Sequence, residues 1–138
     1  MFDGFPDNII INCGDTISNV TVPDTIIKSP NYPDDYPADQ DCRTVITFTE
    51  EERVRLQFLA FDLESSSTCN YDWLEVRDGD DASANLTGSR LCGEQIPGSI
   101  LSSGNSLYIE FNSDEYATES GFKVKVYIGK EQFKVLAF

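Results

Sequence analysis

Apolar and polar residues alternate one by one in several short stretches, a pattern typical of β-strands with one buried face. In the clearest stretch, Val54, Leu56 and Phe58 alternate with arginine and glutamine. No segment has the 3.6-residue period of a helix. We therefore expect strands at residues 17–22, 25–28, 43–48, 54–58, 73–77, 107–111 and 122–128.

Turn-forming residues separate these stretches, at Pro23–Asp24, Asp78–Asp81 and Ser102–Asn105. Residues 29–42 contain three prolines and four aspartates. They therefore form an ordered surface loop rather than a helix or a central strand. Many short strands with such turns predict an all-β protein, an antiparallel β-sandwich of two sheets. The 138 residues suffice for one domain with a sizeable core.

We expect residues 13–128 to form this domain, with residues 1–12 as a leader. Residues 129–138 follow as a C-terminal tail, for which an edge strand, a linker and a contact between subunits of a homo-oligomer all stay open. The leader lacks the basic and apolar segments of a signal peptide, and no stretch of the chain is long enough to span a membrane. A secreted origin therefore implies that the signal sequence is not part of this chain.

The net charge of −14, from 24 acidic and 10 basic residues, limits the classes of partner. It argues against nucleic acid and anionic lipid, which require clustered cations, and it suits basic proteins and divalent cations. The chain has no histidine, which excludes Ser-His-Asp and Cys-His catalytic sites. Glu64 and Asp72 are a conceivable glycosidase pair, but the single tryptophan argues against an aromatic-lined substrate cleft. We expect no enzyme activity.

Four cysteines occur at positions 13, 42, 69 and 92, without the spacing of a zinc site. An even number in a small β-rich chain predicts two disulfides and an oxidising, extracellular compartment. Three connectivities are open on this evidence. Asn19 and Asn85 begin N-x-T sequons, which mark them as candidate glycosylation sites of a secreted protein.

Four oxygen-bearing side chains lie in three predicted loops: Tyr36, Glu64, Asp72 and Asp114. Each lies near the end of an expected strand, and loops of a sandwich gather at its two ends. Three carboxylates brought together would repel and would attract a hard cation, calcium before magnesium. The alternative is that all three are ordinary solvated loop acids.

Five stretches of the chain together resemble the CUB domain, an extracellular module of many multidomain proteins. They occur in that family's order and cover most of the chain: S-P-N-Y-P-D-D-Y-P (29–37), Y-D-W-L-E-V-R-D-G (71–79), L-C-G (91–93), S-S-G-N-S-L-Y-I-E-F-N-S-D (102–114) and G-F-K-V-K-V-Y (121–127). The resemblance implies a jelly-roll sandwich of two sheets and the disulfides Cys13–Cys42 and Cys69–Cys92. The family often has tryptophan where this chain has Thr44, and we expect Trp73 to fill part of that volume.

The same resemblance implies a calcium site. Calcium-binding members of the family have acidic residues at the positions of Glu64, Asp72 and Asp114, and a tyrosine at the position of Tyr36 that contacts them. Backbone carbonyls just after the last aspartate complete the coordination in the family. In this chain those carbonyls correspond to residues 116–117, that is, Tyr116 and Ala117.

For function, the resemblance implies a non-catalytic module that recognises other extracellular proteins in a calcium-dependent way. In related domains the acidic site receives a lysine or arginine of the partner, and we expect Tyr36, Glu64 and Asp72 to make that contact. The alternative is a structural spacer or oligomerisation module of a larger secreted protein. In that role calcium would only make the loops rigid.

Overall fold

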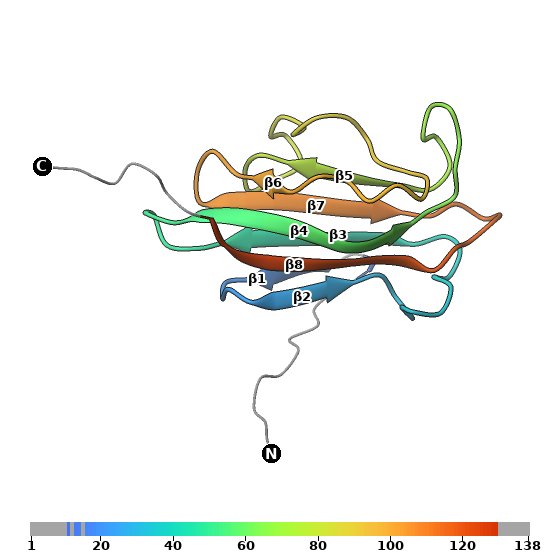
Figure 1. Cartoon of the computed structure of the whole chain (residues 1–138), viewed down its shortest axis with the longest axis horizontal. Helices are drawn as coiled ribbons and strands as arrows, with labels where there is room; N and C mark the ends of the chain where they lie inside the picture. Colours follow the sequence, from blue (N-terminus) through green and yellow to red (C-terminus); the bar gives the residue numbers. More distant parts are fainter. Residues whose placement is uncertain (1–10, 12, 15, 130–138) are drawn as a thin grey trace, which may run out of the picture.

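The computed structural model describes residues 11, 13–14 and 16–129. These described residues form eight strands in two four-stranded sheets that pack as a β-sandwich without helices (Figure 1). One sheet has the strand order β1-β3-β7-β5 and the other β2-β8-β4-β6. The strands are β1 (Ile17–Val20), β2 (Thr25–Lys28), β3 (Asp41–Thr47), β4 (Arg53–Asp62), β5 (Trp73–Arg77), β6 (Ile100–Leu101), β7 (Ser106–Asn112) and β8 (Gly121–Gly129).

The all-β class and the two-sheet sandwich are confirmed, and each of the seven expected strands is present. β6 was not expected, because two residues are too short to show alternation. β1 ends at Val20, two residues before its predicted end, and β8 continues to Gly129. The antiparallel expectation fails at one pair, since β1 runs parallel to β3. The leader residues 1–10 and 12 and the tail residues 130–138 lie outside the described residues.

The alternation seen in the sequence produces the core between the sheets. Leu56 of β4, Val126 of β8 and Phe111 of β7 are each fully buried, and their sequence neighbours point outward. Full burial of side chains of this size stabilises the fold by about 1.5–3 kcal/mol each. At one end of the core, Phe111 packs edge-to-face on Phe122 and on Tyr36, a residue of the β2–β3 loop. These aromatic contacts hold that loop against the sandwich.

The expected filling of the Thr44 position by Trp73 is wrong. Thr44 is buried on the inner side of its sheet, but Trp73 precedes the inward-facing Leu74 and so lies on the outer side. There its ring stacks on the guanidinium of Arg90, with 4.1 Å between the guanidinium carbon and the ring centroid.

Two disulfides, Cys13–Cys42 and Cys69–Cys92, join the cysteines in the pairing that the family resemblance implies. The bonded cysteines are separated by 29 and 23 residues. On the chain-entropy model, loops of this length give each disulfide about 3–4 kcal/mol of stabilisation. The second disulfide ties the β4–β5 loop to the segment that follows Leu91.

Strand register determines which loops meet. Asp41 of β3 and Trp73 of β5 both lie opposite Asn112 of β7, and in the other sheet Asp62 of β4 lies opposite Gly121 of β8. The β2–β3, β4–β5 and β7–β8 loops therefore leave the sheets at the same end of the sandwich (Figure 1). This end is where the sequence places the candidate metal ligands.

The outer face of the β1-β3-β7-β5 sheet carries a row of charged residues. Glu110 lies in register between Arg43 and Glu75, and Glu75 itself is held by arginines at 2.9 and 3.0 Å. Burial, together with the adjacent Asp41, raises the pKa of Glu110 from its ordinary value of 4.5 to about 7. Glu110 is therefore protonated more readily in the folded chain than in the unfolded chain.

This shift predicts how Glu110→Gln changes stability with pH. A raised carboxyl pKa contributes stability that is present below about 4.5 and is lost as the pH rises towards about 7. Relative to the original protein, the glutamine variant should gain stability as the pH rises from 5 to 8, because it carries no charge to bury. Urea unfolding at several pH values measures this difference. The exposed turn variant Glu50→Gln controls for the loss of one charge, and an equal effect there would contradict the assignment.

Candidate metal centre

Tyr36 reaches the site from the proline-rich β2–β3 loop. Its backbone N–H donates to the carbonyl of Glu119 at 3.0 Å, and its ring packs on Phe111, which leaves the residue only 1 % exposed. The phenol is therefore fixed from two sides before it makes any polar contact. Its oxygen donates to Asp72 Oδ2 at 2.6 Å and accepts from the Glu64 backbone N–H at 3.2 Å.

Asp72, directly before β5, is the most buried acid of the site, with 1 % of the residue exposed. Both of its carboxylate oxygens accept hydrogen bonds: Oδ2 from Tyr36 and Oδ1 from the backbone N–H of Asp114 at 2.8 Å. A buried carboxylate is costly unless such donors hold it. Asp72 thus links the β2–β3 and β7–β8 loops through its two oxygens.

Asp114, just after β7, is held by backbone N–H groups of two other residues. Its carbonyl accepts from the Asp39 N–H at 2.9 Å, and its side-chain Oδ1 accepts from the Tyr116 N–H at 3.1 Å. The preceding Ser113 is buried, and its hydroxyl donates to the carbonyl of Pro37 at 2.8 Å. These bonds bring the loop after β7 against the proline-rich loop.

Glu64 enters from the β4–β5 loop, where the backbone of Leu63 bonds to Gly93 and the Cys69–Cys92 disulfide restrains the rest of the loop. Its carboxylate Oε1 is buried and has no hydrogen-bond partner. Buried polar atoms nearly always have a partner in native proteins. A carboxylate oxygen in this state is one that a bound cation would satisfy.

The structure brings Glu64, Asp72 and Asp114 together, each with one carboxylate oxygen within 4.8 Å of the oxygens of the other two. Calcium binds oxygen at 2.3–2.6 Å, so two of its ligand atoms lie at most about 5 Å apart. The cluster contains only oxygen ligands and fits calcium in both chemistry and size.

The electrostatics of the cluster also indicate a cation. Burial raises the pKa of Glu64, and the charges of Asp72 and Asp114 raise it further. Burial raises the pKa of Asp72 as well, although its hydrogen bonds from Tyr36 and the Asp114 amide oppose the shift. Burial, followed by the hydrogen bond to Asp72, raises the pKa of Tyr36 far above its usual range, so the phenol stays a donor. Bringing these acids together thus has an electrostatic cost that a divalent ion would offset.

The other candidates are placed as follows. Tyr116 is 70 % exposed, and Ala117 is also exposed in the same loop; carbonyl ligation by either residue stays a prediction. Asn19 and Asn85 are exposed, as glycosylation requires.

Sequence reasoning missed Glu119, whose charge helps to raise the pKa of Glu64. No motif marks Glu119, and only the folding of the β7–β8 loop brings it near.

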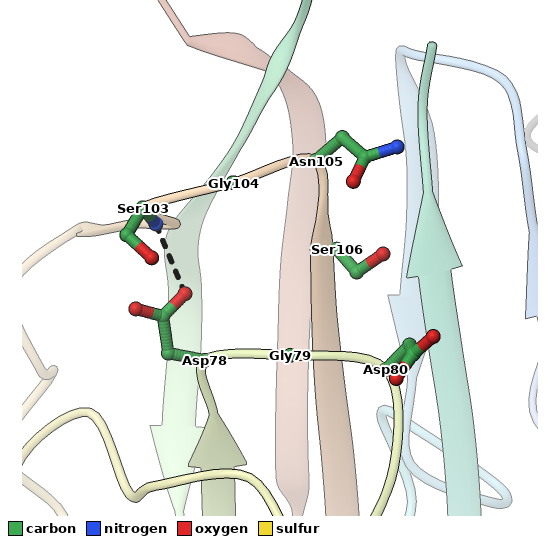
Figure 2. A pocket seen from close by; sticks show the side chains of 7 residues that line it. All are labelled: Asp78, Gly79, Asp80, Ser103, Gly104, Asn105 and Ser106. Carbon is green, nitrogen blue, oxygen red and sulfur yellow. Dashed lines mark hydrogen bonds between the residues drawn. The ribbon is translucent and has the colours of Figure 1, made fainter. Parts of the chain in front are cut away.

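A second acidic group lies at the opposite end of the sandwich, around a pocket of about 210 Å³. Asp78 Oδ1 accepts there from the Ser103 N–H at 2.9 Å, whereas Asp80 lies on the other side of Gly79, away from Asp78 (Figure 2). The two carboxylates do not converge. Among the described residues, the cluster of Glu64, Asp72 and Asp114 is the one with the geometry of a metal site.

Comparison with known proteins is consistent with this geometry. The family model described as "CUB domain" matches residues 13–126. The chain is 35 % identical over 133 residues to the dorsal-ventral patterning protein tolloid of Drosophila melanogaster, a match that covers 96 % of this chain and 12 % of tolloid. Other curated relatives are likewise much longer, and the chain spans 3 % of canine cubilin.

Two solved structures have the same fold. The MASP-1 CUB2 domain bound to Ca²⁺ superposes with a TM-score of 0.70 at 30 % identity, covering 80 % of this chain and 96 % of that one. The full extracellular region of zebrafish Gpr126/Adgrg6 gives a TM-score of 0.71 at 31 % identity, covering 80 % and 14 %. In the described part of the present chain, no helix has the length and apolar character needed to cross a membrane.

The bonding of Tyr36 predicts the effect of Tyr36→Phe. Loss of the hydroxyl leaves Asp72 Oδ2 and the Glu64 N–H without their partner, which should lower the free energy of unfolding by about 1–3 kcal/mol and weaken calcium binding. Urea unfolding and calcium titration measure the two effects. Tyr71→Phe removes the same atom from a residue that is 49 % exposed and should behave as the original protein. Unchanged stability in Tyr36→Phe would contradict the role given to this hydroxyl.

Proposed function

The chain belongs to the CUB domain family, and from this we propose that it is a calcium-dependent module for recognition of other extracellular proteins. The family places the module outside the cell, in secreted proteins or ectodomains. CUB domains are non-catalytic in the solved neighbours. The activity and partners of the longer relatives belong to whole proteins of which this chain covers a small part.

The observation that carries the proposal is the meeting of three carboxylates, two from the β4–β5 loop and one from the β7–β8 loop, around a buried, unpartnered oxygen of Glu64. Calcium at this position would bind Glu64, Asp72 and Asp114, with carbonyls of Tyr116 or Ala117 completing its coordination. A solved neighbour binds calcium. The ion would hold the β4–β5 and β7–β8 loops in one arrangement, to which Tyr36 joins the β2–β3 loop by hydrogen bonds. It would also turn the remaining lone pairs of the carboxylates towards a common point.

A lysine or arginine of the partner protein would then bind at this point, because the acids around the ion retain net negative charge. Of the three residues proposed for this contact, Glu64 is partly exposed, whereas Tyr36 and Asp72 are each 1 % exposed. We therefore assign the first contact to Glu64. Tyr36 and Asp72 act mainly by fixing the position of its loop, through the bond from Glu64 N–H to the phenol.

A purely structural role is the second candidate, and the burial of Asp72 favours it. Asp72 joins two loops by hydrogen bonds and offers almost no surface to a partner. In this reading calcium makes the end of the sandwich rigid within a larger extracellular protein or a homo-oligomer. The two candidates differ in what happens when Glu64 alone is changed.

Binding to a lysine-containing peptide on beads, with and without EDTA, tests the recognition role. Removal of calcium makes the protein more negative, so unspecific attraction to lysine should increase in EDTA. Specific capture should instead be lost in EDTA and should weaken at high salt. Glu64→Gln should reduce capture in calcium several-fold, and a glutamine-for-lysine peptide should not bind.

Glu50→Gln, which removes one exposed acid at the other end of the sandwich, is the matched control and should bind as the original protein does. Thermal melting in calcium separates the two candidates. If Glu64→Gln lowers the melting temperature but binds the lysine-containing peptide as well as Glu50→Gln does, the structural role is correct. Capture that persists in EDTA would rule out calcium-dependent recognition.

A further inference from the structure

Basic side chains gather on the outer face of the β2-β8-β4-β6 sheet. On β8, Lys123 and Lys125 alternate with core residues and therefore point outward. Lys28 of β2 and Arg55 of β4 hold outward positions by the same alternation. With Arg53, these are five of the ten Lys and Arg residues of a chain whose net charge is −14.

Strand register arranges four of these cations in a line, the basic stripe, made of Lys28, Lys123, Lys125 and Arg55. Lys28 lies directly opposite Lys123, Lys125 follows two residues further along β8, and Arg55 lies opposite Tyr127 after two more. At about 3.4 Å per residue, the stripe is roughly 14 Å long and runs parallel to the strands. β2, β8 and β4 lie side by side in the sheet, so the stripe lies on one continuous face (Figure 1).

Among the described residues, the positive charge of Lys28, Lys123 and Lys125 is poorly neutralised. Lys28 and Lys123 are like charges in directly opposed positions, which destabilises a sheet, and among the described residues neither forms an ion pair. Lys125 Nζ lies 3.9 Å from Asp24 Oδ1, but the two side chains are 43 % and 74 % exposed, so the pair is weak. An external anion would relieve the repulsion.

Tyrosine rings lie beside two of the lysines. The ammonium of Lys28 is 5.9 Å from the ring centroid of Tyr32, and that of Lys125 is 5.7 Å from that of Tyr127. Such rings present a flat apolar surface next to a cation. A sulfated sugar is complementary to both, because its ring has an apolar face and its sulfate carries the opposite charge.

We propose that this face binds a linear sulphated polysaccharide, which would lie along β8. A linear polyanion can contact every cation of the stripe at once, whereas a compact acidic loop of a second copy would reach one or two. An anionic membrane is disfavoured, because docking this face would also bring the acids at both ends of the sandwich close to the bilayer. The screening length of about 8 Å at physiological salt lets a local basic stripe act despite the net charge.

Immobilised heparin is the probe for this site, with EDTA present so that the calcium site takes no part. The four cations of the stripe would each contact one sulfate. By analogy with protein contacts to nucleic-acid phosphates, four such contacts predict that heparin affinity falls roughly a hundredfold between about 50 and 200 mM salt. The triple variant Lys28→Gln/Lys123→Gln/Lys125→Gln should lose most of the binding. With one cation of the stripe left, the heparin affinity of this variant should fall only roughly three- to fourfold over the same salt range.

Lys123→Gln and Arg43→Gln form a matched pair, since they change the net charge equally on opposite sheets. Only Lys123→Gln should weaken heparin binding, and a cooperative thermal melting transition in each variant confirms that both are folded. An equal loss of heparin affinity in the two variants, or no heparin binding by the original protein at low salt, would overturn the proposal. So would equally strong binding to phosphatidylserine vesicles, or self-association that the triple variant abolishes.

Discussion

The buried carboxylate of Asp72 is the constraint around which the functional end of this domain is built. An acid with 1 % exposure persists only because a phenol and a backbone amide, from two different loops, both donate to it. The same phenol accepts from Glu64. Three loops far apart in the sequence thus have one common arrangement, and that arrangement leaves acidic oxygens close enough to share one ion.

Alternation predicted the sandwich well, because each long strand buries one face. It could not find β6, which is two residues long, or the parallel pairing of β1 with β3, which depends on a distant partner. Their positions in the loops singled out the acids of the site, and the resemblance assigned them to calcium, but their meeting depends on strand register. Neither the near-complete burial of Asp72 nor the nearby charge of Glu119 has a sequence signal.

The charges of the domain are separated in space, and this separation would let one chain bind both of the proposed partners. The acids at the loop end suit a cation and a basic side chain, whereas β8 carries lysines on a flat outer face. Between them lies the core, with Phe111 and Phe122 packed beneath Tyr36. Because the loops rest on this rigid core, we expect the two surfaces to act independently of each other.

Isothermal titration with calcium tests the central claim most directly, because it counts bound ions. The original protein should bind one calcium ion per chain at the cluster. Asp114→Asn keeps the shape of the side chain, and its amide oxygen can still accept from Tyr116 N–H, yet this variant should lose measurable binding with the removed charge. No heat of binding in the original protein, or equal binding in Asp114→Asn, would contradict the account.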